Sequence, residues 1–309
     1  MKKKTRIILI ITIIVLAVIA ALLIFRNHFL YQRPDLTIPV AIKNPSYIEK
    51  GPVILFDESH DNFHTATRGY KPFVKLLTAD GYRFRPLNEE LSEASLATAD
   101  VLIIANGLEP LSDPEINAVA EWVKGGKGLL LISDHPPFAS PMKALCKRFG
   151  VNLSGAWTSD PAQEEPDANI STWIRYRRSK GALGEHPILE GRYPDYPNER
   201  INVITSFTGQ SIQSETGISL LKLSDQALDY ETREQSQKAI GGKSAAGRAQ
   251  AVAIEFGKGR VVVLGEAGML TAQVIRFLFF TIKKFGFSRP GNDNRQFALN
   301  IMHWLTRLI

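Results

Sequence analysis

Three short, mostly apolar runs, each followed at once by acidic, histidine or other polar residues, constrain the fold of this chain more than any other feature. They lie at 53–56, 128–132 and 260–264. Runs of this length, bounded by polar residues, are typical of buried strands in a parallel sheet. Helical patterns and short connections separate several such strands, and this alternation predicts an α/β domain. We therefore expect a doubly wound, mostly parallel sheet, as in flavodoxin, over residues 51–309.

One helix of this domain has a clear start and end in the sequence. Ser112 can cap the helix, and Pro114 suits its first turn. Asp113 and Glu115 place negative charge near the positive end of the helix dipole. The glycine pair at 125–126 then predicts the end of the helix.

The N-terminal segment predicts attachment to a membrane. Residues 1–6 are basic and precede an uncharged apolar stretch, which is long enough for a spanning helix of about 20 residues. We expect residues 7–26 to be a transmembrane signal anchor, 1–6 to lie in the cytoplasm by the positive-inside rule, and 27–50 to be a linker. The domain that follows would be extracytoplasmic, on a single-pass protein of the cell membrane. A long cleaved signal peptide is the alternative.

The charge balance argues against nucleic acid as a partner. Residues 1–26 contain five of the 37 Lys and Arg side chains and none of the 31 Asp and Glu side chains, so the rest of the chain is nearly neutral. A nucleic-acid interface needs a clustered basic face. We expect the membrane as a partner through residues 7–26, and an unknown small molecule, glycan or protein as the partner of the domain. A second apolar and basic stretch, 274–285, predicts a helix that lies on the membrane surface or an ordinary buried helix.

Three stretches carry a family resemblance. They are the run 101–137, which contains Leu-Ser-Asp-Pro-Glu and Leu-Leu-Leu-Ile-Ser-Asp, the run 257–266, which reads Gly-Lys-Gly-Arg-Val-Val-Val-Leu-Gly-Glu, and the closing run 292–300. Together they resemble the class I glutamine-amidotransferase-like domains of unknown function found in many bacterial proteins, with related domains in gliding-motility and intraflagellar-transport proteins. The resemblance covers residues 50–309 with a gap in the middle. It implies the fold and leaves the activity open.

The resemblance does not extend to glutaminase chemistry. True class I amidotransferases place a nucleophilic cysteine in a Gly-rich turn between a strand and a helix, but the corresponding turn here is 133–135, Ser-Asp-His. The one cysteine, Cys146, falls in the amphipathic helix that follows, where a buried, inert thiol is expected. A single cysteine also excludes an intramolecular disulfide and a cysteine metal cluster.

A candidate site follows from the ends of the three runs. Parallel strands bring their carboxyl ends to one edge of the sheet, where open α/β domains bind ligands. The polar residues there offer nitrogen and oxygen donors without sulfur, a set that suits a divalent metal, zinc or manganese, in a hydrolytic role. Either Glu58 or Glu266 could then be the general base for a metal-bound water. The candidate metal ligands are Asp57, His60, Asp134 and His135, with Glu266 and His64 as further donors.

Two other interpretations of the same rim stay open. Serine-type acyl transfer would use Ser133 or Ser59 with His135 or His60, but the exposed Gly-x-Ser-x-Gly elbow is absent. Alternatively, the polar side chains cap helices and hold loops, and the rim binds a ligand or partner without catalysis. The sequence thus predicts a metal-assisted hydrolase or, as the alternative, a non-catalytic binding or scaffold domain of an envelope complex.

Overall fold

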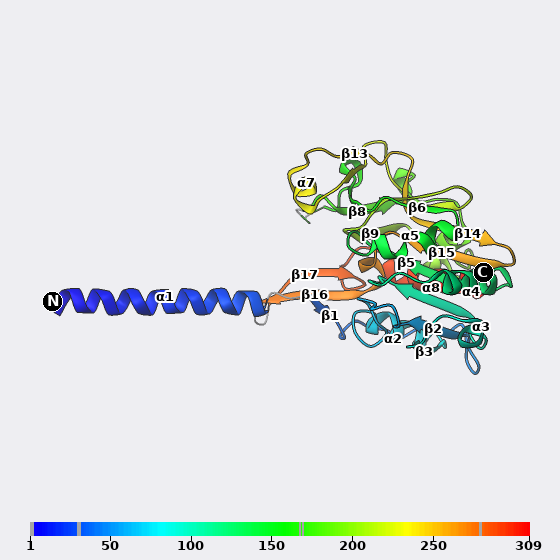
Figure 1. The fold of residues 1–309 in the computed structure, drawn as a ribbon, viewed down its shortest axis with the longest axis horizontal. Coiled ribbons are helices and arrows are strands. Elements are labelled where there is room, and N and C mark those ends of the chain that lie inside the picture. Colours follow the sequence, from blue (N-terminus) through cyan, green and yellow to red (C-terminus); the bar gives the residue numbers. More distant parts are fainter. Residues whose placement is uncertain (1–2, 30–31, 167, 169, 278–279) are drawn as a thin grey trace.

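The computed structural model describes residues 3–29, 32–166, 168, 170–277 and 280–309. Its first element, α1 (Lys3–Phe29), extends away from the body (Figure 1). Within α1, the segment Lys4–Leu23 is long and apolar enough to cross a membrane, and none of it is buried. The predicted apolar helix near the N-terminus is therefore confirmed.

A nine-stranded mixed sheet forms the centre of the body (Figure 1). Five of its strands are mutually parallel, in the spatial order β3 (Arg83–Leu87), β2 (Val53–Asp57), β4 (Val101–Ala105), β5 (Gly128–Ile132) and β15 (Gly259–Leu264). The sheet continues in antiparallel fashion through β14 (Ala249–Phe256), β10 (Ile212–Ser214) and β6 (Val151–Leu153), with β11 (Ile218–Lys222) also paired to β14.

Helices cover both faces of the parallel part, which explains why its central strands are apolar throughout. Successive residues of a strand point to opposite faces, so Ile103 and Leu102 of β4 belong to two different cores. The helices over the Ile103 face are α2 (Lys71–Ala79) and α8 (Asn294–Leu305). Those over the Leu102 face are α3 (Glu93–Leu96), α4 (Asp113–Lys124) and α5 (Ala139–Arg148).

Helix α4 begins as its sequence predicts. The Ser112 side chain accepts a hydrogen bond from the Glu115 backbone N–H, and the Glu115 carboxylate accepts one in return from the Ser112 N–H. This reciprocal capping box satisfies two backbone donors that the helix leaves unpaired. The prediction for this helix start is confirmed.

The remaining elements come after α5 in the chain, except β1, which follows α1. Their strands form three smaller antiparallel sheets. Their helices are short, and two of them are α6 (Pro187–Glu190) and α7 (Arg233–Lys238). The smaller sheets contain β7 (Trp157–Ser159) with β12 (Leu228–Tyr230) and β13 (Lys243–Ser244), β8 (Trp173–Arg177) with β9 (Val203–Phe207), and β1 (Gln32–Pro34) with β16 (Ala272–Phe277) and β17 (Phe280–Gly286). The expected linker 27–50 therefore contributes a strand; its residues 30–31 lie outside the described part.

The prediction of a helix over 274–285 is wrong, both as a helix on the membrane surface and as an ordinary buried helix. It forms most of the antiparallel hairpin β16–β17, in which Val274 faces Lys284; residues 278–279 lie outside the described part. Val, Ile, Phe and Thr dominate this stretch, and such residues favour strands. A short continuous apolar run does not distinguish a strand from a buried helix by its period alone, so the sequence pattern was ambiguous at this point.

The topology confirms a mixed α/β fold with a parallel central part. Beyond that part the main sheet is antiparallel, and the smaller sheets are antiparallel as well. The parallel part fixes which strand ends lie together, and with them the position of the candidate site.

Candidate functional site

The carboxyl ends of β5 and β15 lie side by side because these parallel strands pair in register, with Ile132 opposite Leu264. The segments that follow them therefore start at the same edge of the sheet. Asp134 and Glu266 both line a cavity of about 750 Å³ at this edge. His135 and His64 line the same cavity.

A second cavity of about 1000 Å³ adjoins the first one. The two share several lining residues, among them Gln32, His135 and Thr208. We refer to the two connected cavities as the crevice. Its outer part is lined by Trp157 from β7 and Arg233 from α7, so elements of the middle region close over the strand ends.

The Asp134 carboxylate is buried and is held by backbone donors. Its Oδ1 accepts the N–H of His135 at 2.7 Å, and its Oδ2 accepts the N–H of Ala267 at 3.2 Å. Burial raises the pKa of Asp134 to about 6, although the charge of His135 and these hydrogen bonds oppose the rise. Asp134 thus ties the loop after β5 to the loop after β15.

Glu266 is buried in a similar way. Its Oε1 accepts the N–H of Gly268 at 2.6 Å, and its Oε2 accepts the N–H of Met269 at 2.7 Å. Burial, and after it the negative charge of Asp134, raises the pKa of Glu266 well above its ordinary value. Two buried carboxyl groups that disfavour each other's charge therefore line the same cavity.

The imidazole of His135 is fixed against the crevice wall. Its ring stacks on Trp157 with 3.8 Å between the centroids, and its Nδ1 lies 2.8 Å from the carbonyl oxygen of Pro136. A carbonyl oxygen can only accept a hydrogen bond, so Nδ1 carries the proton and donates. Nε2 lies 3.9 Å from Oδ1 of Asp134 and, in the neutral ring, keeps a lone pair.

His64 lies in the wall of the crevice between the rings of Phe63 and Tyr70. Its Nδ1 is buried and has no hydrogen-bond partner in the part of the chain that the structure describes. Burial lowers the pKa of His64 to about 4, so the ring is neutral at pH 7.

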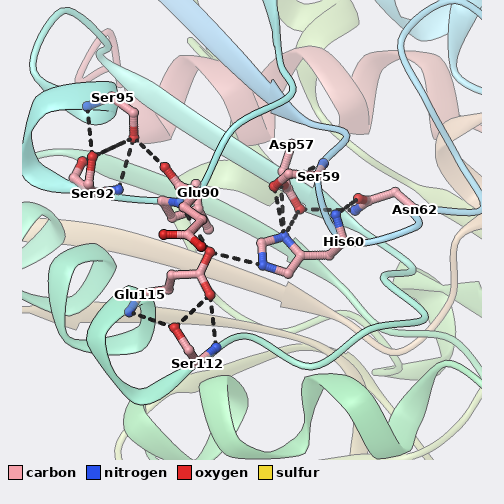
Figure 2. Close-up of polar contacts among 10 residues, drawn as sticks. Asp57, Ser59, His60, Asn62, Glu90, Ser92, Ser95, Ser112 and Glu115 are labelled. Carbon is pink, nitrogen blue, oxygen red and sulfur yellow. Dashed lines mark hydrogen bonds and ion pairs between the residues drawn. The ribbon is translucent and has the colours of Figure 1, made fainter.

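Asp57 and His60 belong to a separate buried network (Figure 2). The Nδ1 of His60 lies 3.0 Å from Oδ2 of Asp57, and its Nε2 lies 3.2 Å from Oε1 of Glu115. Asp57 also accepts hydrogen bonds from Ser59 and Asn62. Burial alone would lower the pKa of His60, but its hydrogen bond and charge interaction with Asp57, helped by Glu115, outweigh burial and raise it. Each ring nitrogen of His60 thus faces a carboxylate oxygen.

The structure therefore divides the predicted site. Asp134, His135 and Glu266 line the crevice, whereas the lining residues of the crevice include neither Asp57 nor His60. Glu58, the other candidate base, accepts the Ala66 N–H at 2.9 Å and is also absent from the lining. Within the described residues, no group of three or more His, Cys, Asp or Glu side chains is placed to hold a metal ion. Metal binding stays a prediction.

Sequence reasoning missed several crevice residues, and two of them have an unusual backbone. Asn106, at the end of β4, has φ 50°, and Thr208, after β9, has φ 86°. Left-handed backbone is rare for a residue other than glycine and is an outlier for a β-branched one. Such strain concentrates at functional sites. Both residues directly follow a strand and precede a glycine, Gly107 and Gly209, and this pattern was the signal in the sequence.

The fold and the cavities define the chain as an α/β domain with a crevice at the carboxyl ends of its parallel strands. Residues 62–275 match the family model described as a domain of unknown function, DUF4350, and the chain belongs to this family. No curated protein matches it.

Solved structures share the fold at low sequence identity. The mmIFT52 N-terminal domain is 13% identical, with a TM-score of 0.58 over 82% of this chain and 97% of that chain. A cytoplasmic protein from Salmonella typhimurium is 13% identical, with a TM-score of 0.47 over 82% and 98% of the two chains. A putative ThuA-like protein from Bacteroides uniformis is 12% identical, with a TM-score of 0.42 over 88% and 95%. At such identities only the fold is shared, and of these three likenesses only the first is strong enough to support it.

Proposed function

We propose that this chain is a membrane-anchored, extracytoplasmic binding domain that holds a small polar ligand in the crevice. The observation that carries the proposal is the strained backbone of Asn106 and Thr208, both of which line the crevice. Strained backbone of this kind clusters at active sites and ligand sites, where it prearranges the groups that bind. The aromatic and polar lining of the crevice is also typical of small-molecule sites.

The charge of the outer crevice favours a ligand with an acidic group. Arg233 and Lys283 line this part, with Glu164 as the acidic side chain among its lining residues. Lys283 already donates to the carbonyl oxygen of Ala168, so Arg233 is the better placed cation. A cleft lined by an excess of one charge raises the local concentration of the opposite charge.

A ligand screen with a matched pair of variants tests the proposal. The full chain would be screened by saturation-transfer NMR against uronic acids, amino acids and phosphate esters. We expect Arg233→Ala to lose the signals of acidic hits. Lys238→Ala should keep them, because Lys238 lies in the same short helix but outside the crevice lining and pairs with Glu234. No hits, or hits that survive Arg233→Ala, would contradict this function.

Metal-assisted hydrolysis is the second candidate, and the buried pair Asp134 and Glu266 beside His135 favours it. In this reaction Asp134 and His135 would hold zinc or manganese, and Glu266 would act as the general base. We expect elemental analysis of the purified protein to find a stoichiometric metal that His135→Ala removes. A metal-free protein of normal stability would favour the binding domain instead.

Glutaminase chemistry is no part of either proposal. The amidotransferase-like resemblance supports the architecture, but Cys146 is fully buried in α5, and burial raises the pKa of its thiol. A thiol must ionise to act as a nucleophile.

A further inference from the structure

The hairpin β16–β17 extends from the body toward the carboxyl end of α1 (Figure 1). The pairing of β1 with β16 fixes this arrangement. Gln32, which follows α1 closely in the chain, lies opposite Ile275, and Pro34 lies opposite Gln273. Because the pairing is antiparallel, β16 runs from the body toward α1 and continues past Gln32 to Phe277. The tip of the hairpin therefore points at the end of the anchor.

The length of chain between α1 and β1 limits how far this tip can be from a membrane. Arg26 is the first charged residue after the apolar stretch, and α1 continues to Phe29. At about 1.5 Å per helical residue and at most about 3.5 Å per extended residue, Gln32 lies no more than about 15 Å above Arg26. Beyond Ile275, which lies opposite Gln32, β16 continues for two residues, and these bring the tip about 7 Å back toward the level of Arg26. The interfacial layer of one leaflet is about 5–8 Å thick, so the tip reaches its border.

The tip is apolar and exposed, unlike the base of the hairpin. Phe280 is 73% exposed and Ile282 is 51% exposed, and both lie in β17 close to the end of the hairpin. By contrast, Phe285 at the base is buried and contacts the rings of Trp173 and Phe207. The base thus fixes the hairpin to the body, while the described part of the tip presents large apolar side chains to its surroundings.

The last paired residues of the hairpin are both aromatic, since Phe277 lies opposite Phe280. Cationic side chains follow in β17, where Lys284 is exposed. Aromatic residues concentrate at membrane interfaces, and lysines near the surface are attracted to anionic lipids.

We propose that the tip of the β16–β17 hairpin inserts into the interface of the bilayer that α1 spans. The hairpin is then a second membrane contact, which restricts rotation of the domain about α1. Because Gln273 and Phe285 of this hairpin also line the crevice, the contact holds one wall of the crevice at a fixed angle to the membrane. The anionic phospholipid surface is the partner, and a second copy of the chain is the competing occupant.

Depth-dependent fluorescence of the full chain in vesicles tests this contact. Phe280→Cys, labelled with the environment-sensitive dye NBD, is reconstituted into phosphatidylcholine and phosphatidylglycerol vesicles. We expect a blue-shifted emission that nitroxide groups on the lipid acyl chains quench. Ile48→Cys is the control for an exposed position outside the hairpin. Ile48 is 92% exposed, and its neighbour Tyr47 forms a hydrogen bond with Thr306, just after α8. Unsubstituted protein corrects for labelling of the buried Cys146.

Each outcome decides the proposal. Lipid quenching at position 280, without quenching at position 48, supports insertion. A blue shift at position 280 that lipid nitroxides do not quench would mean that protein covers the tip, and this would overturn the proposal. Emission like that of the dye in water, with equal weak quenching at both positions, would also overturn it. Phe280→Asp should remain folded, because its side chain is exposed, and its body should rotate more freely about α1 in fluorescence anisotropy.

Discussion

Replacing His60 by leucine is expected to destabilise the protein by about 3–5 kcal/mol, because it leaves two carboxylates without the imidazole that contacts both of them. His60 contacts Asp57 through Nδ1 and Glu115 through Nε2, and both the imidazole and the Asp57 carboxylate are buried. Leucine is similar in size, so little of the loss should come from a cavity. Asp57 keeps its hydrogen bonds from Ser59 and Asn62, which places the loss within this range and not above it.

Denaturant unfolding in detergent, followed by near-UV circular dichroism, measures this loss. Lys124→Ala is the control, since Lys124 and Glu121 form an exposed ion pair and such pairs contribute about 0–1 kcal/mol. Glu115→Gln preserves the shape of the network but removes one charge, and it should cost less than His60→Leu. If His60→Leu unfolded at the same denaturant concentration as Lys124→Ala, the network would not hold the fold together.

The end of β2 shows how much of the site could be predicted from the sequence. That Asp57 and Asp134 follow strands of one parallel sheet was predictable, because apolar runs with polar ends have one usual meaning. The partners of these residues were not predictable. The sequence predicted only that Glu115 places negative charge near the start of a helix, and the packing of α4 brings one of its carboxylate oxygens to Leu91 and His60.

The crevice walls mark the limit of sequence reasoning more sharply. Trp157 begins a short strand, Thr208 directly follows another, and Arg233 begins a one- to two-turn helix, all in the middle of the chain. Such elements have no period long enough to detect, and their positions depend on contacts distant in sequence. In the same way, 274–285 has an apolar and basic composition that fits a helix as well as a strand. In the structure it pairs with itself as the β16–β17 hairpin and with residues 32–34, and the apolar period alone does not predict these pairings.

The second large effect is expected in acid, where His64 should make the protein unstable. Burial lowers the pKa of His64 from 6.5 in the unfolded chain to about 4 in the folded protein. The unfolded state therefore binds a proton first as the pH falls, and stability that is present above pH 6.5 is lost between pH 6.5 and 4. At 1.36 kcal/mol per pKa unit, this single group accounts for about 3 kcal/mol. His186, whose pKa burial also lowers to about 4, acts in the same direction.

Other groups titrate with the opposite sign, so a difference between variants isolates His64. The raised pKa values of His60 and Asp134 stabilise the folded protein in acid, and that contribution is lost as the pH rises through them. His64→Leu removes the titrating ring and its unpartnered Nδ1. We expect its unfolding free energy to fall by about 3 kcal/mol less than that of the natural protein between pH 7 and 4. Ile48→Leu, at an exposed position without a titratable group, should follow the natural protein, and parallel curves for all three proteins would show that His64 is protonated without cost.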